Sequence, residues 1–489
     1  LLTQHATEAL LALANSPTSD NSGDGVSADT IMGMMQPVAA VASANLNTAP
    51  TQVISMARLL ARAQCKLHAV DAASSEKTLP TTSHSLVKLF ATPHEGVATE
   101  IAEALISLMR SCIDSGMVQD SIKAIASARA SGKAAPSKPT PLMSVASSVE
   151  AAIGFRYRGA WSVSIPVVTC AFIRLGPASG PILSGALNAL GEMGEHASEL
   201  MCKQQLQDCI TAAIQAMGPE QVLQALPLKL EEAIDAELSN RDDEDGMDMD
   251  EHDIMNAASR ETGRLWLIPL LRSGLIGASM SFFADAILPQ ARALGTRAEQ
   301  ARNKQSAFEA QRCSAAEHAL WSLFPAFANW PNDAAEAFPM MAKDLGNALS
   351  SRIDLQGPIC EGLKRLIRQG RIGAGVYEVD DDDEAGDGAS TIAAGEANDD
   401  DMPALFTVDV AEAQLVAVGK YARNFLPILF NLFIASPTSR RGELSHTIGA
   451  FAKVTDQQQL GGFFRTVLRK LVKVTADDPG APDALVEGG

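Results

Sequence analysis

Four apolar segments of this chain repeat one pattern, in which an aromatic side chain is followed two to five positions later by a proline. A proline inside a helix removes a backbone donor and crowds the carbonyl four residues earlier, so it bends the helix or starts a new one. This repetition restricts the chain to a fold built from packed apolar helices. The four segments are Trp161–Pro166, Arg264–Arg272, Leu320–Phe327 and Asn424–Phe433.

Composition agrees with a helical fold. Hydrophobic residues make up 46% of the 489 residues and aromatic residues only 5%, and Ala and Leu dominate the periodic segments, which favours helix over strand. No Asn-Gly or Asp-Gly turn joins two alternating apolar runs, so nothing predicts a hairpin. The class we predict is all-α.

The spacing of the four prolines suggests a repeat. Pro166, Pro269, Pro325 and Pro427 are separated by 103, 56 and 102 residues. If each wide gap holds two units, the unit is roughly 40–55 residues long, as in HEAT-like helical hairpins. We therefore expect a solenoid of stacked hairpins rather than a closed helical bundle. In Arg264–Arg272 we expect Trp266 and Leu267 in the core, Pro269 at the bend, and both arginines at the margins.

Apolar periodicity and capping signals place the individual helices. Residues 71–83 are predicted to be a polar connector, and Asn332 or Asp333 is predicted to cap the helix that follows. The predicted helices are 51–70, 97–113, 142–153, 159–175, 181–193, 199–217, 219–226, 255–273, 275–294, 297–328, 332–350, 355–370, 408–435, 441–453 and 456–474.

Two acidic stretches divide the helical body. The formal net charge is −19, but residues 241–253 contribute −7 and residues 378–401 contribute −11. The rest of the chain is therefore nearly neutral, and such acidic blocks are typical of solvated, disordered insertions. The predicted segments are N-terminal helical repeats at 1–140, repeats at 141–240, an acidic loop at 241–253, repeats at 254–372, an acidic disordered insertion at 373–404, repeats at 405–475 and a tail at 476–489.

No pattern in the sequence points to catalysis, a cofactor or a metal. Ser131-Gly132-Lys133 is followed by Ala134 rather than the Ser or Thr of a phosphate-binding loop. The acidic blocks lack the carboxylate that a calcium loop needs at its twelfth position, and the histidines and cysteines show no metal-ligand spacing. The seven cysteines include no Cys-x-x-Cys pair, which indicates reduced core thiols. We therefore predict no enzyme, no cofactor and no small-molecule substrate.

Membrane insertion is not expected either. The longest apolar run, Phe425–Ala435, is shorter than the about 18 residues that cross a bilayer. The chain begins at Leu1 rather than Met and ends in a small polar tail, so we expect it to be a fragment.

Two basic stripes are the remaining functional signal. Each follows helical spacing, so its members share one face. Such a face can bind RNA phosphates, and it can equally be a solvated helix surface. The stripes are Lys364, Arg365, Arg368 and Arg371, and Arg465, Arg469, Lys470 and Lys473.

Several segments together resemble the ribosomal RNA processing protein twelve family of eukaryotes. They occur in the family's order between about residues 155 and 435, whereas residues 1–140 resemble the family only in being helical. The family's basic C-terminal tail is absent here. The segments are Tyr157–Trp161, Met217–Leu228, Trp266–Arg272, Phe282-Phe283 with Leu288-Pro289, Leu320–Phe327 with Pro331–Asp333, and Tyr421–Phe433.

This resemblance implies a HEAT/armadillo-like, non-enzymatic scaffold of the nucleus and nucleolus. Its partners would be pre-rRNA and pre-ribosomal assembly factors, mainly of the small subunit, and the implied roles are pre-rRNA processing, subunit maturation and nuclear export. A Ran-type GTPase and export receptors are further implied partners. The alternative is a karyopherin-like nuclear transport receptor that binds Ran and nucleoporins.

Overall fold

The computed structural model describes residues 27–44, 49–91, 94–133, 136, 138–196, 200–244, 263–376, 403 and 405–477, and every regular element in these ranges is helical. The chain forms two compact units. The first comprises Leu1–Leu230 with Ala257–Gly274, and the second comprises Glu231–Asn256 with Leu275–Gly489.

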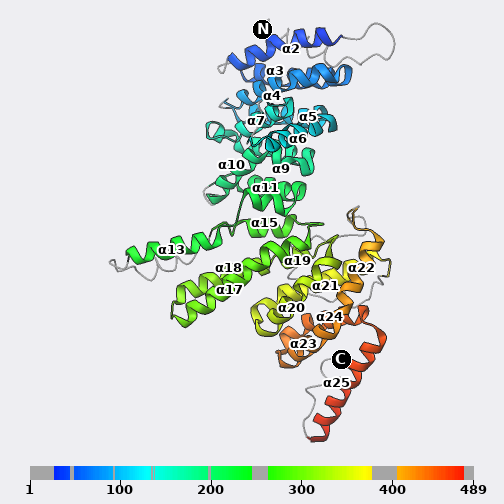
Figure 1. Cartoon of the computed structure of the whole chain (residues 1–489). Coiled ribbons are helices and arrows are strands. Elements are labelled where there is room, and N and C mark those ends of the chain that lie inside the picture. Colours follow the sequence, from blue (N-terminus) through cyan, green and yellow to red (C-terminus); the bar gives the residue numbers. More distant parts are fainter. Residues whose placement is uncertain are drawn as a thin grey trace. The chain divides into compact units, whose positions relative to one another are not determined.

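The first unit has two layers of stacked helices (Figure 1). Helix α2 (Ala28–Ala44) packs on the first helix of each layer. The connections contain the 16-residue helix α6 (Ser115–Ala130) and three short elements. The short elements are the 3-10 segments η1 (Phe155–Ala160) and η2 (Gly176–Ala178), and α9 (Ser179–Ile182). One layer contains α3 (Pro50–Val70), α5 (Glu95–Cys112), α8 (Trp161–Leu175), α11 (Lys203–Met217) and α15 (Leu267–Gly274), and the other α4 (Ala72–Leu89), α7 (Pro141–Ala151), α10 (Ser184–Glu195) and α12 (Pro219–Ala225).

The second unit is also built from packed helix pairs, with α17 against α18, α19 against α21, and α23 against α24. Helix α22 packs on both α20 and α21. The elements of the second unit are α13 (Leu230–Glu244), α16 (Met280–Phe282), the π-helical turn η4 (Phe283–Ile287), α17 (Leu288–Asn303), α18 (Ala307–Trp321), α19 (Phe324–Phe327), α20 (Ala334–Ser351), η5 (Ile353–Leu355), α21 (Gln356–Gly373), α22 (Val408–Lys420), α23 (Ala422–Ala435), α24 (Thr438–Val454) and α25 (Gln457–Asp477).

The aromatic residues of the proline segments form the core of the second unit. The Phe283 ring lies 5.7 Å from that of Phe324 and 5.3 Å from that of Phe327. The Phe425 ring lies 6.0 Å from Phe338 of α20 and stacks on Phe451 of α24 at 5.4 Å. These rings join consecutive helices, so the segments act in packing.

The prolines act in two ways. Pro166 and Pro427 lie inside α8 and α23, whereas Pro325 is in the first turn of α19. Pro269 lies in the first turn of α15, where its missing donor costs no helical hydrogen bond. The expectation that Pro269 bends a helix spanning 255–273 is therefore wrong, since α15 begins only at Leu267.

The expectation that Arg264 lies at the margin of its apolar segment is also wrong. It is 9% exposed, and its Nε donates to Glu195 Oε1 at 2.9 Å. Its Nη1 also donates to the Pro227 carbonyl at 3.3 Å. The adjacent Trp266 ring lies against Gly194, where a Cβ atom would come within 2.4 Å of it. Arg264 and Trp266 thus fix the start of α15 against α10 and against the Pro227 carbonyl.

The predicted connector at 71–83 is wrong, because these residues belong to α4. Asp71 caps this helix by accepting from the backbone N–H of Ala73 and Ser74. The contact of α4 with α3 is polar: Gln64 Nε2 donates to Ser75 Oγ at 2.8 Å, and the Thr82 hydroxyl donates to Gln64 Oε1 at 3.0 Å. Apolar periodicity cannot reveal a helix that packs through such groups.

The predicted helices 275–294 and 297–328 are also divided differently. The first stretch contains α16, η4 and the start of α17, and the second contains the end of α17, then α18 and α19. The first predicted acidic loop begins too early, because residues 241–244 belong to α13. Residues 245–253 of that loop, and nearly all of the predicted insertion at 373–404, lie outside the described residues.

The apolar segment Phe155–Ile182 has the length needed to cross a membrane, and its most apolar 18-residue window has a mean hydropathy of 1.3. In the structure it is divided among η1, α8, η2 and α9, and 56% of its most apolar window is buried. Helix α8 packs between α5 and α11, as a core helix of a helical repeat does.

Asp333 connects the starts of two helices. It occupies the N-cap position of α20, but its side chain makes no hydrogen bond to that helix. Its carboxylate instead accepts from the backbone N–H of Met280 and Ser281 at 2.8 and 2.9 Å, and from the Ser279 hydroxyl at 2.7 Å. Burial works to raise the pKa of Asp333, but these hydrogen bonds outweigh it and hold the pKa below its ordinary value. Asp333 therefore ties the start of α20 to the start of α16.

We predict that Asp333→Asn lowers the free energy of unfolding at neutral pH by about 1–3 kcal/mol. Because the folded-state pKa is depressed, the stabilisation is present above the ordinary aspartate pKa of about 3.9 and disappears as the pH falls below it. Denaturant unfolding at neutral pH and at about pH 3 should show a difference between the variant and the original chain that shrinks in acid. Asn332→Ala is the matched control, and an equal loss of stability in both variants would contradict this role.

Candidate nucleic-acid interface

The predicted stripe on α21 is partly occupied by contacts within the second unit. Lys364 Nζ lies 3.0 Å from Glu361 Oε2, and Arg365 donates to Glu361 Oε1 at 3.5 Å and to the Pro325 carbonyl at 3.1 Å. Burial works to raise the pKa of Glu361, but the charges of Lys364 and Arg365 outweigh it and lower that pKa. Arg365 therefore helps to hold α21 against α19, and Lys364 pairs within α21.

The other half of the α21 stripe faces outward. Arg368 is exposed, and Arg371 is half-buried with its Nη2 donating to the Val376 carbonyl at 3.1 Å. Helix α21 carries a single carboxylate, Glu361, against its four basic residues. An approaching anion would therefore meet a net positive helix, with Arg368 as its most accessible cation.

The stripe on α25 is more exposed. Arg465 and Arg469 are both exposed and lie one helical turn apart. Beside them, Phe464 is 61% exposed and Leu468 is 47% exposed, so the apolar side chains near this stripe are themselves accessible. Phe463 anchors the helix, with its ring 4.8 Å from that of Phe430 on α23. The side chains of Lys470 and Lys473 lie outside the described residues.

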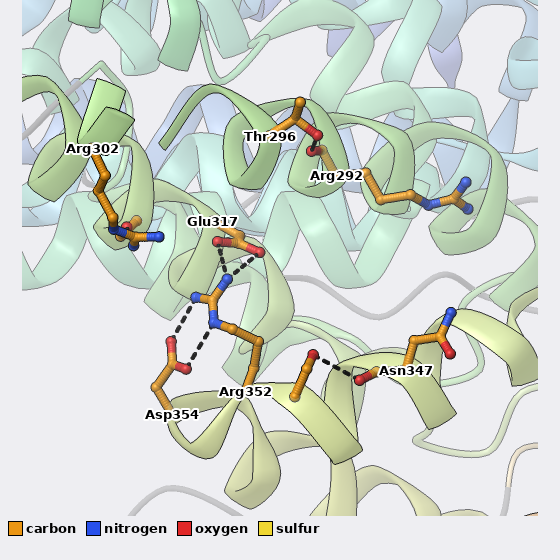
Figure 2. A network of polar contacts seen from close by, with 9 residues as sticks. Arg292, Thr296, Arg302, Glu317, Asn347, Arg352 and Asp354 are labelled. Carbon is orange, nitrogen blue, oxygen red and sulfur yellow. Dashed lines mark hydrogen bonds and ion pairs between the residues drawn. The ribbon is translucent and has the colours of Figure 1, made fainter. Parts of the chain in front are cut away.

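A partly buried charge network lies between α18 and η5, and it has a structural role (Figure 2). Arg352 Nη1 donates to both oxygens of Glu317, at 3.0 and 2.8 Å. Its Nε and Nη2 donate to Asp354 at 3.0 and 2.8 Å. Each charge is thus satisfied within the network, which leaves it no evident part in ligand binding.

Gly295 of α17 allows this network to form. A Cβ atom at residue 295 would lie 2.7 Å from Glu317 Oε1, so a larger residue would displace the carboxylate. Burial raises the pKa of Glu317 even though Arg352 works against the rise. The network therefore holds α18 and η5 together through the Glu317 carboxylate, which depends on Arg352, and α17 packs against that carboxylate at Gly295.

The structure also contains a groove of mixed polar and apolar lining that sequence reasoning missed. It lies between α20 and α23 and has a volume of about 330 Å³. Lys343, Asn347 and Asn424 line it, and Pro339 and Ile428 form apolar walls. No spacing signal in the sequence could have brought residues of these two helices together. Among the described residues, no group of three or more His, Cys, Asp or Glu side chains is placed to hold a metal ion.

We predict that Arg352→Met costs about 3–5 kcal/mol of unfolding free energy, because it leaves Glu317 buried without its partner. The control Asp354→Ala removes a carboxylate that is 46% exposed and should cost about 0–1 kcal/mol. Without Arg352 the pKa of Glu317 should rise further, so the destabilisation should diminish once acid protonates Glu317. Chemical denaturation that shows equal destabilisation in the two variants would contradict the network's role.

Comparison with known proteins identifies the family. The family described as "Ribosomal RNA-processing protein 12, HEAT repeats" matches residues 91–244 and 248–436. This chain belongs to that family. The match confirms the expected HEAT-repeat fold class, and it extends the resemblance to residues 91–140, which the sequence had related to the family only through their helical character.

Curated relatives agree with this assignment. The RRP12-like protein of Gallus gallus is 27% identical over 401 residues, which cover 80% of this chain and 25% of that protein. The RRP12-like protein of Homo sapiens is 26% identical over 411 residues, covering 82% and 26%. Ribosomal RNA-processing protein 12 of Saccharomyces cerevisiae is 22% identical over 319 residues, covering 64% and 22%. The chain thus spans about a quarter of the length of these relatives.

One solved structure, of an engineered protein, aligns at 12% identity and a TM-score of 0.21, over 92% of this chain and 94% of that one. A TM-score this low supports no structural argument.

Proposed function

We propose that this chain is part of a non-enzymatic scaffold that binds pre-rRNA and assembly factors during ribosome biogenesis. The observation that carries the proposal is the family match across residues 91–244 and 248–436, together with relatives whose name refers to ribosomal RNA processing. Such a role places the protein in the nucleus and nucleolus. It includes small-subunit maturation and nuclear export, with a Ran-type GTPase and export receptors as further partners.

The fold is suited to this role in a physical sense. Repeats of helix pairs bury their apolar faces against neighbours and leave outer faces and connections free along a long surface. Outside 241–253 and 378–401 the chain is nearly neutral, so RNA meets little general repulsion there. Arg368, Arg465 and Arg469 provide exposed cations on that surface.

The co-sedimentation partners of the full-length nuclear protein test the proposal. Pre-rRNA and small-subunit assembly factors in the same gradient fractions would support a ribosome-assembly scaffold. Nucleoporins and Ran without rRNA would overturn it in favour of the karyopherin-like transport receptor.

The α25 stripe gives a sharper prediction. Changing Arg465, Arg469 and Lys473 to Glu should weaken RNA binding and lower the salt dependence of log K by about 0.7 for each phosphate that is no longer bound. Fluorescence anisotropy with a labelled single-stranded RNA at several salt concentrations measures both quantities.

The matched control reverses the same number of charges elsewhere, at the exposed residues Arg110, Lys123 and Arg129 of the first unit. If the control weakens binding as much, net charge alone accounts for the effect. If the α25 variant binds like the original chain, this stripe is a solvated helix face.

A further inference from the structure

The connection between α7 and α8 presents side chains that the fold does not use. In this segment, η1, Tyr157 is 7% exposed, and its ring lies edge-on to that of Phe90 at 6.5 Å. Trp161 Nε1 donates to the Gly154 carbonyl at 3.3 Å. These two anchors fix the segment at its middle and at its end, while Phe155, Arg156 and Arg158 are exposed.

Phe155 is the most unusual of these residues. Its side chain is 77% exposed, although burial of a phenylalanine is worth about 1.5–3 kcal/mol. Met201, in the connection between α10 and α11, is fully exposed as well. Burial raises the pKa of the neighbouring Cys202 thiol, and the positive charge of Arg158 partly offsets that rise.

The arginines beside Phe155 are held by rings rather than by acids. The Arg158 guanidinium lies 5.9 Å from the Phe155 ring centroid, and that of Arg156 lies 5.6 Å from the Tyr157 ring centroid. Within the described part of the chain, no carboxylate forms an ion pair with either guanidinium. Both keep donors available to an anion, and the rings limit how far they can move.

These groups together match one class of ligand. An exposed aromatic plane stacks on unpaired bases, and adjacent guanidinium groups bind phosphates and stack on bases as well. Duplex RNA hides its bases in the stack and would use only the arginines. An acidic peptide would use the arginines and leave the Phe155 plane without a matching flat partner.

We propose that Phe155, Arg156 and Arg158, called here the η1 patch, bind single-stranded RNA. Phe155 stacks on a base, and the two arginines contact the flanking phosphates. This site rests on the proposed function in that its ligand is the RNA to be processed, and it is independent of the α25 stripe.

The test compares variants of the full chain by fluorescence anisotropy with a labelled, mixed-sequence single-stranded RNA and with the same sequence as a duplex. Phe155→Ala should lower single-strand affinity about 5- to 100-fold. It should leave the slope of log K against log salt concentration (the salt slope) unchanged, and it should change the affinity for the duplex little. Phe155→Trp should retain the affinity. Arg156→Gln with Arg158→Gln should lower the affinity and reduce the salt slope by about 1.4, or 0.7 for each phosphate.

Two controls match these changes in the same unit. Ile173→Ala truncates another exposed apolar side chain, 66% exposed on α8, and Lys123→Gln with Arg129→Gln removes two charges from α6. Neither should alter single-strand binding, and circular dichroism should show unchanged helical content in every variant.

Equal single-strand affinity in the original chain and in the η1 variants would overturn the η1 patch. That result would leave the scaffold function standing if the full-length protein still sediments with pre-rRNA. Unchanged RNA affinity with loss of one co-sedimenting assembly factor would assign the patch to a protein partner instead, which also overturns the proposal.

Discussion

Aromatic rings packed between consecutive helices hold the second unit together. A single helix pair cannot bury its own apolar face, so each pair needs the next. In the second unit Phe425 illustrates this, because its ring contacts Phe338 of an earlier helix and Phe451 of a later one. Pro427, two residues away, shapes the same helix. The proline segments therefore serve to pack the helices against one another.

This packing separates structural charges from those that can bind a partner. Asp333, Arg352 and Arg264 are at least partly buried, and each connects elements far apart in the sequence. Arg465 and Arg469 are exposed on a terminal helix of the second unit. Helix α21 combines both kinds, since Arg365 holds the Pro325 carbonyl while Arg368 faces solvent. A basic stripe in a sequence thus overstates the charge available to RNA.

Sequence reasoning could predict the helices that bury an apolar stripe, because the 3.6-residue period records that burial directly. It failed at α4, whose contact with α3 depends on Gln64, Ser75 and Thr82. It placed Asn332 or Asp333 at the start of α20, and Asp333 does occupy the N-cap position. It could not predict the bond from Met280 to the Asp333 carboxylate, because that bond spans 53 residues that no local rule connects. The family could be recognised because the motifs occur in order. The η1 patch could not be predicted, because the exposure of Phe155 depends on how Tyr157 and Trp161 pack against other parts of the first unit.

RNA–protein crosslinking in native pre-ribosomes, followed by mass spectrometry of the crosslinked peptides, would show directly whether this part of the chain binds RNA. We expect RNA attached to peptides that contain Phe155–Arg158 or Arg465–Arg469, and none on the buried aromatic residues of the proline segments. Purified pre-ribosomes that contain the protein, yet show no crosslink anywhere within residues 27–477, would contradict the claim that this part of the chain binds RNA.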